Sequence, residues 1–307
     1  MLDLMKLHAF VYAAESLSFS KAAKRLHVTQ PTVSHHIKNL EQELGIDLFE
    51  RTGSELQLTE AGRILLPWAR KLIRQAIDLQ EMMDSLQNEI VGSIRIACST
   101  TSGKYLLPQL AARFHEQYPW VKIKILSCTP AYVVPHLLED DANLGVVSRE
   151  VSEESLEHQE FFEDHIILIA AADHPWAQLP YIEPSDMLEE PFIMRERGSG
   201  TRQVLLDMLN KHDISMDDLD VYLEVGNAEA IVETVAAGFG VSFVSRLAAV
   251  CALEQDKIVE VPVVDLELRR KIYMIRRTYD VRNRAQEVFW SYIHDPDNKD
   301  LLLMASA

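Results

Sequence analysis

The sequence has few cysteines and no long apolar run, and each of these absences excludes a class of protein. Three cysteines, Cys98, Cys128 and Cys251, lie far apart, with no CxxC pair and no His/Cys spacing typical of a metal site. This argues against a disulfide scaffold and against a zinc site. No stretch approaches the ~20 apolar residues of a membrane span, and no charged-then-apolar leader opens the chain. We therefore expect a cytoplasmic protein without a metal or a cofactor.

A chain of 307 residues, 48% of them hydrophobic, is long enough for two or three structural units with sizeable cores. Its net charge of −17 is unevenly distributed. Residues 1–92 carry 10 basic and 12 acidic side chains, a net charge of −2, whereas residues 93–307 carry 20 and 35, a net charge of −15. The first part can therefore keep a basic face for nucleic acid, while acidity in the second weakens non-specific attraction to DNA.

Residues 18–43 have the pattern of a helix-turn-helix. Ser18 is placed to cap a short helix, and Thr29 to cap a second helix that has Pro31 in its first turn. An apolar stripe at spacings of 4, 3 and 4 residues faces inward on the second helix: Val33, Ile37, Leu40 and Leu44. The remaining outward side chains are of types that reach base edges and phosphates. We therefore expect DNA contacts from Ser18, Lys21, Thr29, Gln30, Pro31, Thr32, Ser34, His35 and Lys38.

A small wing and a long helix are expected next. Residues 46–58 predict two short strands that turn at residues 52–54, with Arg51 near the tip as a further DNA contact. The helix then runs from residue 59 to about residue 88, bent at Pro67. Four leucines seven residues apart indicate a dimerising coiled-coil seam: Leu65, Leu72, Leu79 and Leu86. The alternative is that this stripe packs on the helix's own domain.

After residue 92 the pattern changes to alternating strands and helices, which is typical of parallel α/β sheets. The number of elements after residue 160 exceeds what one lobe needs. We therefore expect a two-lobed domain whose cleft lies at the carboxyl ends of the strands. Loop-to-helix junctions at residues 100–102, 199–202 and 226–228 would present free N–H groups to an anion there.

Over essentially its whole length the chain resembles the LysR-type transcriptional regulators. The resemblance is carried in the first part by Phe10, Ala13, Ser18, Phe19, Ala22, Ala23, Leu26, Val28, Gln30, Pro31, Val33, Ser34, Ile37, Leu40, Glu41, Leu44, Gly45, Leu48, Phe49, Arg51 and residues 58–62. In the second part it is carried by Leu107, Pro108, Phe114, Pro119 and residues 173–175 and 236–241. Where the family usually has an arginine after the serine of the reading helix, this chain has His35, so the operator sequence cannot be carried over.

The resemblance implies an α plus α/β architecture. It comprises a winged helix-turn-helix (1–58), a dimerising linker helix (59–90) and an effector-binding domain similar to type 2 periplasmic binding proteins (91–307). Lobe I would be 91–162 with 266–307, and lobe II 163–265. The implied function is a DNA-binding transcriptional regulator, not an enzyme. It would read an interrupted palindrome as a dimer or a tetramer, with RNA polymerase as a further partner.

Two segments, 100–108 and 195–202, resemble the branch that regulates carbon fixation and sulfur or nitrogen assimilation, whose signals are often small anions. The family match also places Thr101, Thr129 and Ser148 at the cleft. The full expected effector set is Thr100, Thr101, Ser102, Thr129, Ser148, Glu196, Ser199, Gly200, Thr201, Arg202 and Asn227. The alternative for the hydroxyl and amide residues is helix capping, at ~1 kcal/mol each. Glu196 would repel anions, bind a protonated ligand or pair with Arg202.

Three competing functions remain open at this level. Cys98 and Cys128 end strands that we expect to be neighbours, so a redox sensor is one alternative. A DNA binder that ignores ligand is another. An enzyme or a transport receptor fused to a DNA anchor is the third, but the scattered histidines form no catalytic constellation and no secretion leader is present.

Overall fold

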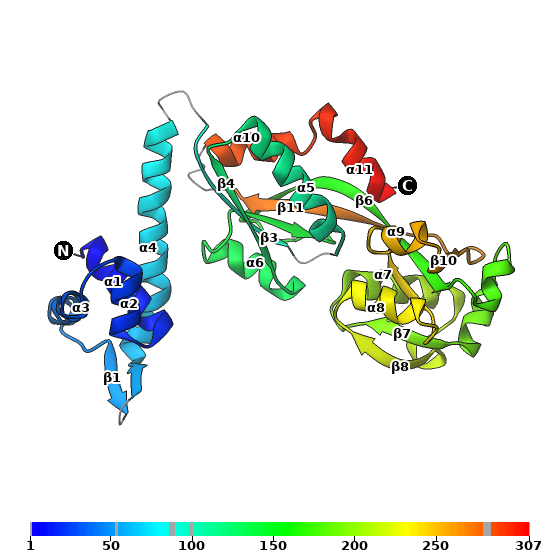
Figure 1. The fold of residues 1–307 in the computed structure, drawn as a ribbon, viewed down its shortest axis with the longest axis horizontal. Coiled ribbons are helices and arrows are strands. Elements are labelled where there is room, and N and C mark those ends of the chain that lie inside the picture. The colour runs from blue at the N-terminus through cyan, green and yellow to red at the C-terminus, as the bar shows by residue number, and fades with distance from the viewer. Residues whose placement is uncertain (1, 53–54, 86–89, 99–100, 279–283, 307) are drawn as a thin grey trace. The chain divides into compact units, whose positions relative to one another are not determined.

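The computed structural model describes residues 2–52, 55–85, 90–98, 101–278 and 284–306 (Figure 1). The chain folds as two compact units, Met1–Glu89 and Ile90–Ala307. Among the described residues no helix is both long and apolar enough to cross a membrane.

The first unit is the expected winged helix-turn-helix followed by a long helix. Three helices come first: α1 (Leu4–Ser16), α2 (Phe19–Leu26) and α3 (Gln30–Leu44). The antiparallel strands β1 (Phe49–Thr52) and β2 (Glu55–Leu58) form the wing, and α4 (Glu60–Ser85) completes the unit. Of the expected turn and seam, Gly53, Ser54 and Leu86 lie outside the described residues.

The predicted caps begin both helices of the helix-turn-helix. Ser18 Oγ accepts a hydrogen bond from the Lys21 N–H at 3.3 Å, and Thr29 Oγ1 accepts one from the Thr32 N–H at 3.4 Å. Three of the four predicted stripe residues, Val33, Ile37 and Leu40, are buried. The prediction is wrong for Leu44, which is 39% exposed. The helix ends at Gly45, and Leu48 fills the core in its place.

The second unit contains one mixed sheet in the order β10-β6-β11-β5-β3-β4, with β9 also paired to β6. Its strands are β3 (Gly92–Cys98), β4 (Val121–Ser127), β5 (Leu144–Val147), β6 (Leu156–Ala171), β9 (Ser242–Ser245), β10 (Ile258–Val261) and β11 (Leu268–Arg277). A separate parallel pair is formed by β7 (Pro191–Arg195) and β8 (Asp220–Val225). The expectation of purely parallel sheets is correct for β3, β4, β5 and the β7–β8 pair. It is wrong for β6, β9, β10 and β11, whose pairings are antiparallel.

Helices cover these sheets in two groups. Around the first lobe lie α5 (Thr101–Gln117), α6 (Pro130–Leu138), α10 (Arg284–Tyr292) and α11 (Lys299–Ser306). Around the second lie α7 (Gly200–Leu209), α8 (Ala228–Ala236) and α9 (Arg246–Glu254). The sequence analysis did not predict α9 or α11. Short 3-10 turns fill the connections: η1 (Pro175–Gln178), η2 (Pro184–Glu189), η3 (Asn210–His212), η4 (Met216–Asp218) and η5 (Pro296–Asn298).

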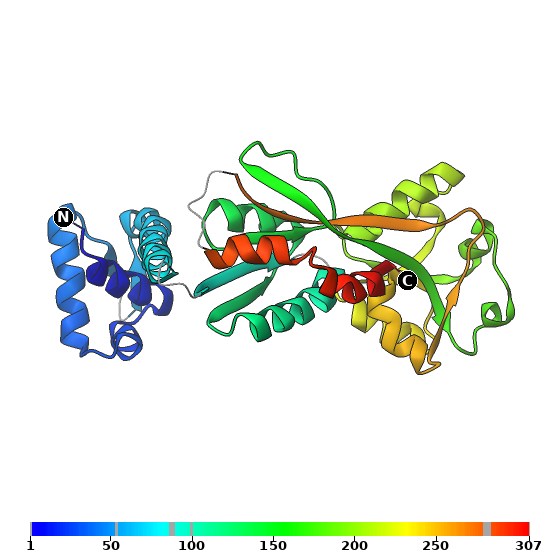
Figure 2. The ribbon, with the colours of Figure 1, turned by 90° about the horizontal axis from the view of Figure 1, so that it is seen from above.

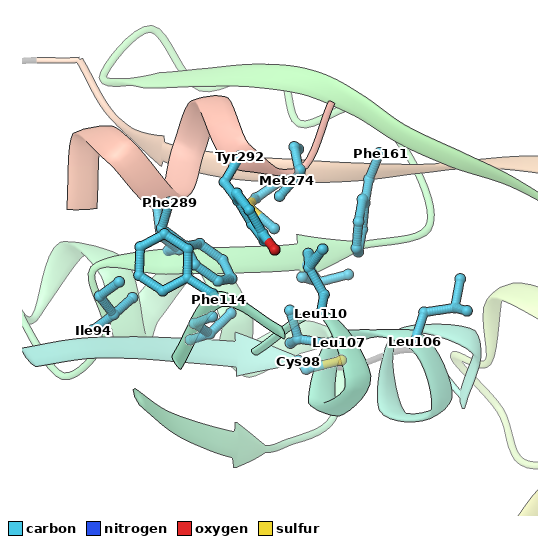
Figure 3. Close-up of a cluster of buried hydrophobic side chains, with 14 of the residues drawn as sticks. Ile94, Cys98, Leu106, Leu107, Leu110, Phe114, Phe161, Met274, Phe289 and Tyr292 are labelled. Atoms are coloured by element: carbon cyan, nitrogen blue, oxygen red, sulfur yellow. The ribbon is translucent and has the colours of Figure 1, made fainter. Parts of the chain in front are cut away.

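Each lobe has its own core, and two long strands join them. In the first lobe Phe114 packs edge-on against Phe289 and Tyr292, with ring centroids 5.0 Å apart in both pairs (Figure 3). The second lobe is built around Phe192, Leu205 and other apolar side chains of β7, α7 and α8. The strands β6 and β11 run side by side from one lobe to the other (Figure 2). Their register shifts between Ile272 and Tyr273, where an irregularity interrupts the ladder.

Candidate functional sites

The predicted DNA-reading residues form one outward surface of α2, α3 and the wing. Lys21, Thr29, Gln30, Pro31, His35, Lys38 and Arg51 are exposed, and Ser18, Thr32 and Ser34 are partly exposed. Ser18 and Thr29 also cap their helices. His35 Nε2 lies 3.0 Å from Asn39 Nδ2, one helical turn further along. Asn39 thus joins this surface as a residue that the sequence analysis did not single out.

A groove of about 750 Å³ lies between α3 and the wing. Ser34 and Lys38 line it from α3, and Arg51 lines it from β1. Glu41 also borders the groove, but its carboxylate accepts the backbone N–H groups of Leu48 at 2.8 Å and Phe49 at 3.2 Å. The Glu41 carboxylate therefore connects the wing to α3 through hydrogen bonds. Lys38 and Arg51 are the basic residues of the groove lining, which also includes Asp47 and Glu50.

Arg25 is a basic residue of α2 whose side chain contacts α1. Its Nη1 lies 2.6 Å from Glu15 Oε2, and its guanidinium stacks 4.0 Å from the centroid of the Tyr12 ring. Both contacts hold α2 against α1. We therefore assign Arg25 to the packing of this unit.

One face of α4 is apolar and exposed. Leu65, the first residue of the predicted seam, is partly buried against the core of its own unit with Ala69 and Ile73, so it leaves the expected dimer face. Leu72 and Leu79 stay on that face. Together with three further exposed residues they define the α4 ladder, spaced 4, 4, 7 and 4 residues apart: Ile64, Trp68, Leu72, Leu79 and Met83. Such a ladder on a free helix is typical of a coiled-coil contact.

In the second unit, Gly200 at the start of α7 lies against Ser148, which follows β5. A Cβ at position 200 would collide with Ser148 Oγ and lie 2.8 Å from Arg270 Nη1. We call these three residues, Ser148, Gly200 and Arg270, the interlobe junction. The structure therefore brings together two predicted effector residues from different lobes, and adds an arginine that was not predicted.

The hydroxyl groups of Ser199 and Thr201, on either side of Gly200, do not cap α7. Ser199 is the N-cap of α7, yet its side chain makes no capping hydrogen bond. Thr201 is 1% exposed, and its Oγ1 has no hydrogen-bond partner among the described residues. An unsatisfied buried hydroxyl is costly, so it favours a site that a ligand completes. Asn227 behaves differently, because its Oδ1 accepts the Glu229 N–H at 2.8 Å and caps α8.

The remaining predicted effector residues are Thr129, Glu196 and residues 100–102. Thr129 begins α6 and is exposed, without a side-chain capping bond. Thr100 and the side chains of Thr101 and Ser102 lie outside the described residues. Glu196 lies close to the α8 junction, since a Cβ on Gly226 would lie 4.0 Å from its carboxyl carbon.

The suggested pairing of Glu196 with Arg202 is wrong. Arg202 Nη1 binds Glu224 Oε2 at 2.6 Å, and this hydrogen bond lowers the pKa of the Glu224 carboxyl. Glu196 instead accepts two hydrogen bonds from one edge of the neighbouring Arg195 guanidinium, from Nε at 2.8 Å and from Nη2 at 2.9 Å. The reason is geometric: Arg195 ends β7 and offers a planar fork to the next residue, while Arg202 faces β8.

A buried ionic cluster behind the interlobe junction was missed. Asp164 on β6 is fully buried and receives Arg270 Nε at 2.8 Å and Nη2 at 2.7 Å. Ser245 Oγ donates to its other oxygen at 2.6 Å. The sequence did contain a signal, because strand alternation places Asp164 and Arg270 on the inward faces of β6 and β11.

The two strand-end cysteines are neighbours, as expected. The Cys128 N–H donates to the Cys98 carbonyl oxygen at 3.1 Å, and neither residue forms a disulfide. Burial raises the pKa of the Cys128 thiol, which leaves less of the reactive thiolate at neutral pH. Cys98 is buried in the core shown in Figure 3. Cys128 therefore lacks the lowered thiol pKa of a sensor cysteine, and Cys98 lacks the exposure of one.

A winged helix-turn-helix joined to a two-lobed ligand-binding domain defines a ligand-responsive DNA-binding regulator. Comparison with known proteins identifies the family of regulators to which the chain belongs. Residues 4–63 match the bacterial regulatory helix-turn-helix model of the LysR family, and residues 87–296 match the LysR substrate binding domain. The chain belongs to the LysR family of transcriptional regulators, which are not enzymes.

The relatives of the chain include probable regulators of RuBisCO, which supports the carbon-fixation branch expected from the sequence. The chain is 32% identical over 275 residues to the probable RuBisCO transcriptional regulator of Synechocystis, covering 89% of this chain and 80% of the relative. It is 34% identical over 284 residues to the uncharacterized HTH-type transcriptional regulator MJ0300 of Methanocaldococcus jannaschii, covering 92% and 96%.

Two solved structures share its fold. Full-length CbnR complexed with its target DNA has a TM-score of 0.73 at 21% identity, over 95% of this chain and 99% of CbnR. The regulatory domain of Synechocystis CcmR in complex with 2-PG has a TM-score of 0.60 at 27% identity, over 66% of this chain and 95% of that domain.

Proposed function

We propose that this regulator binds an interrupted palindromic promoter site as a dimer or a tetramer and responds to a small anionic metabolite held between its lobes. The buried, unpartnered Thr201 hydroxyl beside the interlobe junction carries the effector part. Ser199 and the free N–H groups at the start of α7 add further donors, which favour an anion. The relative CcmR, solved with 2-PG, makes 2-PG a first ligand to test.

The DNA part rests on the reading surface of the first unit. Gln30, Ser34 and His35 lie on the outward side of α3, at the end that would enter the major groove. Lys21, Lys38 and Arg51 would hold the phosphates on either side. The α4 ladder would pair two copies, and a two-fold dimer reads a palindrome.

This proposal includes the expected organisation: residues 1–58 for DNA, 59–90 for dimerisation and 91–307 for the effector, with lobes 91–162 plus 266–307 and 163–265. A DNA-binding regulator of a prokaryotic type would act in the cytoplasm and meet RNA polymerase at its promoters. A pull-down of polymerase on promoter DNA, with and without the protein, tests that contact.

The effector proposal is tested by thermal unfolding against sulfite, sulfate, nitrite, phosphate, bicarbonate, phosphorylated sugars and 2-PG. A ligand at 100 times its Kd should add ~2.7 kcal/mol to the free energy of unfolding. Thr201→Val should abolish most of that gain without destabilising the ligand-free protein, because the hydroxyl has no partner to lose. Thr234→Ala is the control, since Thr234 Oγ1 binds the Ala230 carbonyl of its own helix. No stabilisation by any anion would refute an anionic effector.

The redox alternative makes a different prediction. A Cys98→Ser, Cys128→Ser double variant should keep the DNA affinity and effector response of the wild type, before and after peroxide treatment. A peroxide effect that the double variant loses would instead support redox sensing.

A further inference from the structure

Three arginines of the second unit, at the end of β7, in α7 and on β11, are each paired with a carboxylate. Arg195 is paired with Glu196, Arg202 with Glu224, and Arg270 with Asp164. In the first two pairs the carboxylate is partly exposed, with side-chain exposures of 35% and 45%. In the third pair both side chains are at most 5% exposed. Arg270 is therefore the most completely desolvated cation of the three.

Asp164 fixes one edge of the Arg270 guanidinium. Its Oδ2 accepts a hydrogen bond from Nε and lies 2.7 Å from Nη2, and its Oδ1 accepts a hydrogen bond from Ser245 Oγ. Asp164, Arg270 and Ser245 come from β6, β11 and β9, and β6 pairs with both of the other strands. The side chain of Arg270 thus cannot turn away from Asp164 without breaking a charge-assisted hydrogen bond and a close ion pair in a buried place.

The other edge of the guanidinium faces the interlobe junction. Nη1 lies 2.8 Å from where a Cβ of Gly200 would be, at the first residue of α7 and next to Ser148. Within the described residues no group accepts a hydrogen bond from Nη1. A cationic N–H donor is thus held beside Gly200, the first residue of α7, and the next residue along the helix is Thr201, whose buried hydroxyl has no partner among the described residues.

We propose that Arg270 is the cationic anchor and specificity determinant of the effector site, with Asp164 as its positioning residue. Nη1 donates to one oxygen of an oxyanion, such as a carboxylate, sulfate or phosphate group, while Asp164 keeps the opposite edge in place. Nη1 carries two N–H donors for the anion, and Thr201, Ser148 and the α7 N–H groups hold its remaining oxygens. This inference rests on the proposed anionic effector.

The test is calorimetric titration of the full-length protein with sulfate, phosphate and 2-PG. Arg270→Gln should weaken binding by about 30-fold or more, as loss of one member of a buried charge pair does. Arg269→Gln is the matched control, because the neighbouring Arg269 is exposed and pairs with Glu163 and Glu267. It should bind every anion as the wild type does.

Asp164→Asn gives a second readout that a purely structural role would not produce. It leaves the Arg270 charge buried without its carboxylate, so the ligand-free protein should unfold at a lower temperature. An oxyanion would then supply the missing negative charge. Sulfate should therefore raise the unfolding temperature of this variant by more than it raises that of the wild type, whereas sodium chloride at equal ionic strength should not.

The results of these experiments distinguish failure of the Arg270 anchor from failure of the proposed anionic effector. If none of the three anions binds the wild type, the anionic effector fails and Arg270 has no anchor role. If an anion binds the wild type and folded Arg270→Gln equally well, the effector stands and the anchor is overturned. Should Arg270→Gln fail to fold, Asp164→Asn decides: a sulfate shift no larger than that of the wild type overturns the anchor.

Discussion

Gly200 and Ser148 approach so closely that no side chain fits between them: a Cβ on Gly200 would also lie 2.9 Å from Ser148 Cβ. Ser148 follows β5 of the first lobe, and Gly200 opens α7 of the second. The backbone of Gly200 adopts no left-handed conformation that would itself demand glycine. The constraint is therefore space, and it fixes how near the two lobes come at the proposed effector site.

Gly200→Ala should hold the lobes apart at this point and weaken effector binding, while the protein stays folded. The new methyl group must displace Ser148 or Arg270, and overpacking of this kind typically costs 1–3 kcal/mol. Titration with the effector anion measures the loss. Gly226→Ala is the matched control at the start of α8, because its Cβ would meet nothing closer than 4.0 Å. Equal affinity in the two variants would show that the contact does not govern binding.

On DNA, changes on α3 should separate base reading from phosphate binding. Gln30→Ala should cost ~1–3 kcal/mol on the preferred site and relax its sequence preference, because a base contact is lost. Lys38→Ala should weaken binding to all sequences alike and reduce the salt dependence by about one counterion. Anisotropy titrations at several salt concentrations measure both effects.

Arg25→Ala provides the contrast for these two variants. Because Arg25 binds Glu15 and Tyr12, it should lower the stability of the first unit and leave the salt dependence of DNA binding unchanged. A reduced salt slope for Arg25→Ala would place it among the phosphate contacts after all.

How far the sequence predicts this protein depends on how local each signal is. The caps at Ser18 and Thr29 and the stripe of Val33, Ile37 and Leu40 were predictable, because a cap and a helical period involve only a few neighbouring residues. Leu65 was assigned to the dimer face, yet it turns toward its own core. The heptad pattern alone cannot distinguish the two sides of a helix that are both apolar.

The buried pair was missed for a different reason. Asp164 and Arg270 lie 106 residues apart, so only the pairing of β6 with β11 brings them together. Each stands at an inward position of an otherwise apolar strand face, between Phe162 and Ile166 in one case and between Leu268 and Ile272 in the other. Opposite charges at inward positions of two strands were the available signal. Reading it requires knowing that those two strands are antiparallel neighbours.

For assembly, Leu79→Glu should turn the dimer into a monomer. Leu79 is 55% exposed in the α4 ladder, and a carboxylate there would have to be buried in a two-helix contact. Ile77→Glu is the control, since Ile77 is 45% exposed but lies off the ladder on the other side of α4. Sedimentation velocity gives the mass of each variant. A monomeric Ile77→Glu with a dimeric Leu79→Glu would move the contact to the opposite face.

The Arg113–Asp300 pair, which joins α5 to α11, should give the second unit a defined acid dependence. Two hydrogen bonds of 2.7 and 2.6 Å connect the two side chains, and Arg113 lowers the pKa of the Asp300 carboxyl to about 2 from an ordinary 3.8. A carboxyl whose pKa is lower in the folded state stabilises that state above its ordinary pKa. This stabilisation is lost as the pH falls from about 4 toward about 2.

Asp300→Asn should therefore be less stable than the wild type at neutral pH, with the difference constant down to about pH 5 and shrinking below about pH 4. Urea unfolding of both proteins along a pH series measures it. Since both groups are largely exposed, added salt should reduce the difference at every pH. Arg113→Gln should show the same pH profile, because either change removes the same pair. A difference that persists unchanged at pH 3 would mean that the substitution acts through packing of α11 and not through the charge of Asp300.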